Sequence, residues 1–110
     1  MTFDDYQKQA LTTALKSDDE FKDMMHWVLG LNGEAGEVAE KLKKIIRDKN
    51  GEISEADKHE LAKELGDVLW YLAVFAHDLG VSFDAVAATN LQKLADRQNR
   101  NMLQGSGDNR

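Results

Sequence analysis

The octet LNGEAGEV, from Leu31 to Val38, returns in altered form as LAKELGDV, from Leu61 to Val68. Both octets place a leucine, a glutamate, a glycine, an acid and a valine at the same offsets. On a helix, residues three and four positions apart share a face, so each glutamate lies between a leucine and a valine at the margin of an apolar stripe. The repeat therefore predicts two helices of similar design, each aiming acidic side chains partly inward.

The rest of the chain also has a helical pattern. It contains no proline, and its apolar residues recur at intervals of three and four with no competing strand pattern. The predicted helices span residues 3–15, 20–49, 55–80 and 83–101.

Local signals mark where these helices start and stop. Ser54 and Ser82 are predicted N-caps, and Asn50 with the glycine after it is a stop and turn signal. The second helix has a candidate bend at Gly30 or Gly33. Short links between the helices predict an all-α fold, a four-helix antiparallel bundle in a single domain over residues 1–104. The last residues, 105–110, have no helical pattern and are predicted to form a flexible tail.

Composition restricts the function classes. The chain has 110 residues, with 20 acidic against 14 basic residues and a formal net charge of −6, which disfavours binding of nucleic acid polymers or anionic lipid. It has no cysteine, so neither a thiolate nucleophile nor a sulfur-ligated zinc site is expected. The acidic N-terminus is unlike a signal peptide, and the longest apolar run, VLWYLAVFA, is well short of the ~20 residues that a membrane span needs. We expect a cytoplasmic protein with no membrane or nucleic acid partner.

The two octets together supply the candidate site. Each contains a glycine, Gly36 or Gly66, that costs about 1 kcal/mol of helix propensity relative to alanine, which indicates close approach of another backbone. If the second and third helices pack antiparallel, the octets meet and their acids share one pocket. The four acids are Glu34, Glu37, Glu64 and Asp67.

Such a pocket needs a source of positive charge, because two unit charges ~4 Å apart repel by about 4 kcal/mol at an effective dielectric constant near 20. Protonated carboxyls with raised pKa values would relieve the repulsion, and so would a divalent metal ion. An all-oxygen ligand set suits Mg²⁺, with Mn²⁺ as a substitute. Protein cations are the third alternative, and the candidates are Lys41, Lys43, Lys44 and Lys63.

The sequence GEAGEVAEKLKK, followed by ELGDVLWYLA, resembles the MazG-like all-α nucleotide pyrophosphohydrolases. The signature of that family is E-x-x-E, a spacer of variable length, and then E-x-x-D. The resemblance covers nearly the whole chain, from about Phe3 to the tail, and includes an N-x-x-K-x-x-x-R pattern at Asn90, Lys93 and Arg97.

The resemblance implies hydrolysis of a nucleoside triphosphate, often a deoxynucleotide, to the monophosphate and diphosphate. It implies that the four motif acids hold Mg²⁺ and act in catalysis, and that the protein works as a homodimer or homotetramer. Removal of non-canonical or excess dNTPs is the usual theme of the family. One of the motif acids, or a neighbour such as Glu40, would orient the attacking water, and the sequence does not determine which.

The fourth helix offers candidate phosphate ligands. Asn90, Lys93 and Arg97 share a face, on which Asn90 is expected to point inward among apolar neighbours and to need hydrogen-bond partners. Lys93 and Arg97 are predicted to bind the outer oxygens of the triphosphate, Arg97 in a bidentate manner. The alternative for these two residues is a solvated helix end.

Three rings lie one or two turns from the acids along their own helices. His26, Trp27 and Tyr71 are candidates to stack on or hydrogen-bond a nucleobase, with Tyr71 the best placed. Aromatic residues at helical spacing are more often part of a core, and that alternative stays open. His59 and His77 are interpreted as surface or packing residues.

The third helix is apolar on more than one side. Trp70 and Val74 project away from Leu61, Leu65 and Leu72, and in a small monomer a second apolar face would remain in water. We therefore expect self-association through the Trp70 and Val74 face, most simply as a two-fold dimer.

Two rival functions remain at this stage. A di-iron carboxylate bundle would need E-x-x-H pairs, and no histidine here follows a glutamate by three. A non-catalytic helical adaptor or regulator, whose acids pair with lysines, is the alternative from a different class.

Overall fold

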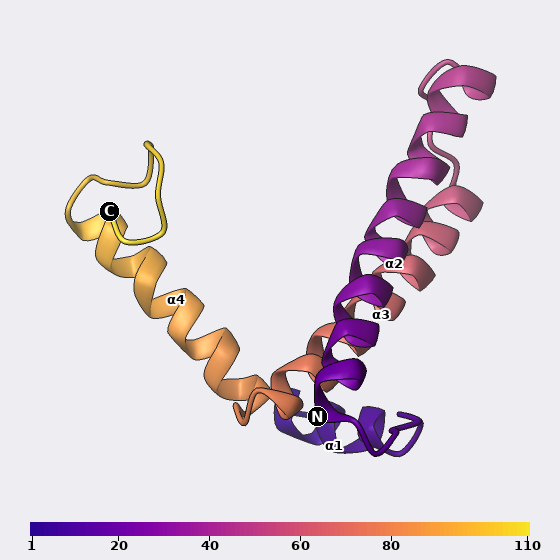
Figure 1. Cartoon of the computed structure of the whole chain (residues 1–110). Helices are drawn as coiled ribbons and strands as arrows, with labels where there is room; N and C mark the ends of the chain where they lie inside the picture. The colour runs from indigo at the N-terminus through magenta and orange to yellow at the C-terminus, as the bar shows by residue number, and fades with distance from the viewer.

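The structure, a computed structural model, describes residues 1–110 as four α-helices without strands. The all-α class and the number of helices predicted from the sequence are confirmed (Figure 1). The helices are α1 (Phe3–Leu11), α2 (Glu20–Lys49), α3 (Glu55–Asp78) and α4 (Phe83–Asn99).

Side-chain caps define the helix starts. Ser54 and Ser82 are N-caps as predicted, and Ser54 forms a capping box with Asp57. Asn50 ends α2 in the left-handed conformation with φ 54°, which asparagine tolerates better than most residues. α2 passes through Gly30 and Gly33 as one unbroken helix of 30 residues, so neither glycine interrupts it.

Three predicted helix ends extend too far. α1 ends at Leu11 rather than residue 15, because the hydroxyls of Thr12 and Thr13 donate to carbonyls three residues back and compete with continued helix. α3 ends at Asp78, since Gly80 adopts φ +78° and turns the chain. α4 ends at Asn99, and Asn101 with φ 56° closes it.

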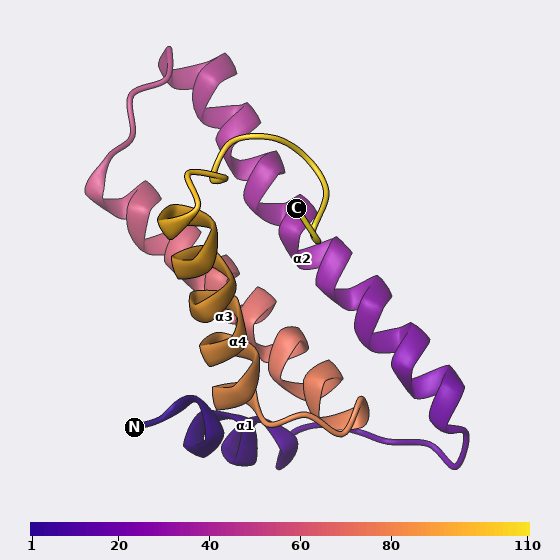
Figure 2. The same ribbon diagram turned by 90° about the vertical axis from the view of Figure 1, so that its left-hand side faces the viewer.

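α2 and α3 form an antiparallel hairpin, with α1 packed across its base (Figures 1 and 2). The apolar core lies at this base, where residues from α1, α2, α3 and the start of α4 meet. Tyr71 of α3 sits over Gly30 of α2, where an added Cβ would collide with its ring. The buried core residues are Ala10, Trp27, Ala73, Val74, Ala76 and Phe83.

α4 leaves the hairpin as a second arm. It is bent by 100° from α3, and it packs on α1 and α3 without contacting α2 (Figure 1). Within one chain, the antiparallel helix pair is therefore α2 and α3, and α4 does not pack alongside them. No single helix is long and apolar enough to cross a membrane, and α3 and α4 meet that test only when counted together as a bent pair.

One side chain of α1 fixes this elbow. Gln7 is buried; its Nε2 donates to the carbonyl oxygens of Ala73 at 2.9 Å and Val81 at 3.3 Å, and its Oε1 accepts from the N–H of Phe83 at 3.2 Å. It thereby satisfies the Val81 carbonyl and the Phe83 N–H at the turn between α3 and α4 and ties both to the Ala73 carbonyl inside α3. Asp4 adds a bond from α1 to α4 by accepting from the N–H of Asp84 at 2.9 Å.

The predicted self-association face is wrong. Val74 is fully buried, and Trp70 packs against Trp27 and donates its Nε1–H to the Thr13 hydroxyl, because α1 and the residues after it cover this side of α3. Leu65 and Leu72 are instead the exposed large hydrophobic residues of α3, at 59% and 40%.

The interpretation of the octet glycines is also wrong. No atom outside their own helix turns lies within 4 Å of a Cβ built at Gly36 or Gly66. The close approach between α2 and α3 occurs at Gly30, nearer the base of the hairpin, where the partner is an aromatic ring rather than a backbone.

Candidate metal centre

The hairpin brings the two octets opposite one another. Glu34 projects from α2, and Glu64 and Asp67 project from α3 one turn apart. Carboxylate oxygens of these three residues all lie within 4.8 Å of one another. We call Glu34, Glu64 and Asp67 the acid cluster.

Glu37 lies beside this cluster, exposed and one turn further along α2. Its charge is one of those that act on Glu34. Partial burial raises the pKa of Glu34 above its ordinary value, and so do the nearby charges of Asp67 and Glu64 and a hydrogen bond with Glu64. In the metal-free protein, burial and the neighbouring carboxylates disfavour the ionised form of Glu34.

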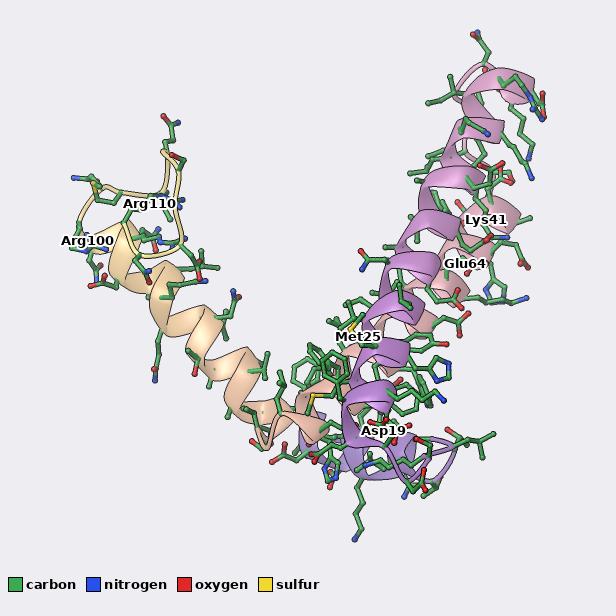
Figure 3. All side chains as sticks on the ribbon, in the orientation of Figure 1. Asp19, Met25, Lys41, Glu64, Arg100 and Arg110 are labelled. Carbon is green, nitrogen blue, oxygen red and sulfur yellow. The ribbon has the colours of Figure 1, made fainter.

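Only Lys41, of the candidate lysines, reaches the cluster. Its Nζ lies 3.4 Å from Glu64 Oε1, with 34% and 16% of the two side chains exposed (Figure 3). The other three lysines serve acids outside the cluster: Lys43 and Lys44 pair with Glu40, and Lys63 pairs with Glu60.

One lysine does not neutralise the acid cluster, so negative charge remains at the middle of the hairpin. The donors are all carboxylate oxygens, which is the ligand chemistry that hard divalent cations prefer. Their mutual distances allow one ion to contact several of them. The residues present therefore fit a divalent metal ion.

Tyr6 is a neighbour of this site that sequence reasoning missed. Its pKa is raised by burial and, to a lesser degree, by the charge of Asp67. Tyr6 reaches α3 because α1 lies across the base of the hairpin. The octet motifs do not include Tyr6. The one sequence signal that could have found it is the apolar pattern of α1, which puts Tyr6 on the packed face of that helix.

The aromatic candidates have different environments. Trp27 is 1% exposed and donates its Nε1–H to Asp78 at 2.7 Å, so the core alternative describes it. Tyr71 is half-buried between α2 and α3. His26 is exposed, stacks on Trp27 with ring centroids 4.9 Å apart, and borders an open cavity of ≈ 360 Å³ at the start of α2. His59 and His77 are both exposed.

The candidate phosphate ligands lie on the α4 arm, away from the acid cluster of the same chain. Asn90 was expected to point inward, but it is exposed and borders an open groove along α4, because no helix packs on this side of α4. Lys93 and Arg97 both contact Asp108 of the tail. Figure 3 shows the separation: Lys41 and Glu64 lie on the hairpin, and Arg100 and Arg110 at the far end of the other arm.

An all-helical hairpin with an E-x-x-E and E-x-x-D cluster defines a class of nucleotide hydrolase, and comparison with known proteins identifies it. The family model for the MazG nucleotide pyrophosphohydrolase domain matches residues 21–102. The chain belongs to this family of divalent-metal-dependent enzymes and is a nucleotide pyrophosphohydrolase, a hydrolase acting on phosphoanhydride bonds.

The chain is also similar to a phage protein. It is 45% identical over 114 residues to the Gene 37 protein of Mycobacterium phage L5, and the match covers 100% of both chains. No solved structure matches it.

Proposed function

We propose that this protein hydrolyses nucleoside or deoxynucleoside triphosphates to the monophosphate and diphosphate in a Mg²⁺-dependent reaction. The observation that carries the proposal is the acid cluster, in which carboxylates from two helices lie within 4.8 Å of one another with one lysine to offset them. Hydrolysis of a phosphoanhydride needs positioned water and cations over the phosphate oxygens, with no covalent nucleophile from the protein.

Glu34, Glu64 and Asp67, with Glu37 beside them, are the residues proposed to hold Mg²⁺, or Mn²⁺ in its place. When bound, the ion would offset charge on the phosphate oxygens and make a coordinated water more acidic. Burial is the main cause of the raised pKa of Glu34, and the charges of Asp67 and Glu64 add to it; bound metal would offset those charges, so that the acids bind it in their ionised form.

One of the four motif carboxylates, those of the acid cluster and Glu37, would orient the attacking water and accept its proton. Glu40 is a weaker candidate for this role, because its carboxylate is held by Lys43 at 3.0 Å and by Lys44 at 3.7 Å. The hydrogen bond with Lys43 and the lysine charges lower the pKa of Glu40, which makes it a poorer base.

The phosphate chain would meet two sets of cations. Lys41 borders the acid cluster and would turn to the phosphates once metal offsets Glu64. Lys93 and Arg97 would bind the outer phosphate oxygens, and since α4 does not contact α2 in one chain, this needs α4 of a second copy. We therefore propose a homodimer or homotetramer, which would also cover exposed leucines such as Leu65.

The nucleobase would lie toward the base of the hairpin. His26 is the favoured contact there, since it is exposed beside an open cavity, and Tyr71 is the second candidate. The proposed role in the cell is removal of non-canonical or excess dNTPs in the cytoplasm.

A panel of NTPs and dNTPs with Mg²⁺ tests the proposed reaction. We expect the monophosphate and pyrophosphate as products, loss of activity in EDTA and partial recovery with Mn²⁺. Release of orthophosphate with a diphosphate nucleotide would contradict the proposed bond cleavage. Retained activity in EDTA would contradict the role of the acids.

A further inference from the structure

The tail forms a loop over the end of α4 (Figure 1), and Asp108 in it places a carboxylate on the cation pair of that helix, Lys93 and Arg97. Asp108 Oδ1 accepts from Lys93 Nζ at 2.6 Å and from Arg97 Nη2 at 3.3 Å. Arg97 Nη2 also donates to the backbone carbonyl of Asp108. One acidic residue thus pairs with both of the cations that are proposed to bind phosphate.

Arg97 is not satisfied by this contact. The residue is only 5% exposed, and its Nε is buried without a hydrogen-bond partner. Buried guanidinium N–H groups normally have acceptors, and leaving one unpaired is costly. A single carboxylate offers fewer acceptor oxygens than a phosphate group, which arginine binds through several N–H groups at once. The unpaired Nε therefore indicates a site shaped for a larger anion.

Polar contacts hold the tail in place. Arg110 donates to the carbonyl oxygens of Met102 at 3.2 Å, Leu103 at 2.9 Å and Gly107 at 2.7 Å. Gly105 and Gly107, with φ +119° and +88°, provide the reversals that other residues rarely adopt.

Opening the tail would cost little. Its residues are exposed except for Arg110, which is half-buried, and the Asp108 side chain is 77% exposed. The Lys93–Asp108 ion pair, with 35% and 77% of the two side chains exposed, contributes only modestly. The Arg97 side chain is buried, but its unpaired Nε shows that the tail leaves it incompletely satisfied, and no apolar core is lost when the tail opens. The same cations can therefore exchange the tail carboxylate for another anion.

We propose that the Asp108 carboxylate stands in for a phosphate group on an anion site formed by Lys93 and Arg97, so that the tail must open before nucleotide or pyrophosphate binds there. This inference rests on the proposed function, which assigns the phosphate chain to these two cations. The tail acts as a built-in competitor that lowers the affinity of the site for phosphates.

Binding of inorganic pyrophosphate in metal-free buffer, measured by titration calorimetry on the full-length chain, tests the competition directly. Asp108→Asn keeps the size of the side chain and removes its charge. We expect its Kd to fall about three- to tenfold, because an exposed carboxylate bound to two cations competes by a modest free energy. Lys93→Gln in the Asp108→Asn background should remove that gain.

Asp96→Asn is the matched control. It also removes one negative charge close to Lys93, from a position one turn along α4, but Asp96 pairs with Arg100 and not with the cation pair. Its Kd for pyrophosphate should stay within about twofold of that of the wild type. An equal gain in Asp96→Asn would mean that general electrostatics, not competition by the tail, raises the affinity.

Arg110→Gln releases the tail by a different route and should also tighten pyrophosphate binding. Unchanged or weaker binding in Asp108→Asn would overturn the proposal; weaker binding would mean that the tail closes over a bound phosphate instead. Absence of pyrophosphate binding in both wild type and Asp108→Asn would overturn it too.

Steady-state kinetics separate this proposal from the proposed function. Asp108→Asn should lower KM for the nucleotide and leave kcat unchanged. Tighter pyrophosphate binding without nucleotide hydrolysis would sink the proposed reaction and leave the tail competition intact. Nucleotide hydrolysis with no effect of Asp108→Asn on KM or on pyrophosphate binding would overturn the tail competition and leave the proposed reaction intact.

Discussion

The two arms of the molecule treat charge in opposite ways. On the hairpin, the carboxylates of the acid cluster outnumber Lys41, their one lysine partner. Burial and, after it, the charges of Asp67 and Glu64 raise the pKa of Glu34. On α4, the cations of Lys93 and Arg97 have a carboxylate from their own tail. The hairpin thus leaves negative charge for a metal ion to offset, whereas the positive charges of the α4 arm are already paired with the Asp108 carboxylate. Each arm is suited to one half of a metal–phosphate complex.

The acid cluster should tolerate no loss of a carboxylate. Glu64→Gln is expected to lower kcat/KM at least about 100-fold, because it removes a proposed metal ligand and the partner of Lys41. Glu60→Gln on the same helix, where Glu60 pairs with Lys63, should keep activity within about twofold of the wild type. Comparable activity in both variants would show that the hairpin charge has no special role.

Gln7 controls how the arms are separated. Gln7→Leu should destabilise the fold by about 2–3 kcal/mol, because it leaves the N–H of Phe83 and the carbonyls of Ala73 and Val81 without this partner. Denaturant unfolding measures the loss, and small-angle scattering should report a changed arm angle.

Gln9→Leu is the control for Gln7→Leu, since Gln9 is exposed and its side chain makes no hydrogen bond. It should change the free energy of unfolding by less than about 0.5 kcal/mol. An equal loss in both variants would argue that α1 helix propensity, rather than the elbow, is responsible.

Two glycines of α2 should respond with opposite sign. Gly30→Ala is expected to cost about 1–3 kcal/mol of stability, since its Cβ would collide with the Tyr71 ring. Gly36→Ala should stabilise the protein by up to about 1 kcal/mol, because nothing occupies the space and helix propensity improves. Melting temperatures of the two variants relative to wild type decide this, and destabilisation by Gly36→Ala would restore the close-approach interpretation.

The smallest expected effect is a pH dependence of the metal-free hairpin. The folded pKa of Glu34 is raised above its ordinary value of 4.5, so the folded state binds this proton more tightly than the unfolded chain. This stabilisation is fully present below the unfolded pKa and is lost as pH rises through the folded pKa.

In EDTA, the melting temperature of the wild type should therefore fall over that range relative to Glu34→Gln. Mg²⁺ should raise the melting temperature of the wild type near neutral pH and have less effect on Glu34→Gln. If the melting temperatures of the two proteins changed in parallel with pH, ionisation of Glu34 would not be the cause of the fall in stability.

The hairpin could be predicted from the sequence because its signals are local. Helical periodicity fixes which octet residues share a face, and a short connection after Asn50 makes antiparallel packing the simplest outcome. The meeting of Glu34 with Glu64 and Asp67 followed from those two facts. That Lys41 alone reaches the cluster did not, because it depends on how α2 is rotated toward α3.

The α4 arm could not be predicted in the same way. Its direction is set by Gln7, a residue distant in sequence whose amide bonds the elbow, and no periodicity reports such a contact. The burial of Val74 could not be predicted either, because it depends on α1 packing over it. The amphipathic pattern of a short helix such as α1 does not reveal which other helix it covers. The bond from Asp108 to Lys93 requires a chain reversal that composition alone does not specify.

The Gln7 elbow makes the two halves of this enzyme separable in evolution. The Gln7 amide, with one further bond from Asp4, holds the direction of α4 and makes no hydrogen bond to the acid cluster, so changes in α1 can redirect the arm proposed to bind phosphate while the carboxylates of the hairpin stay in place. Divergent copies of this fold can in this way acquire new ligand preferences without rebuilding their reactive centre.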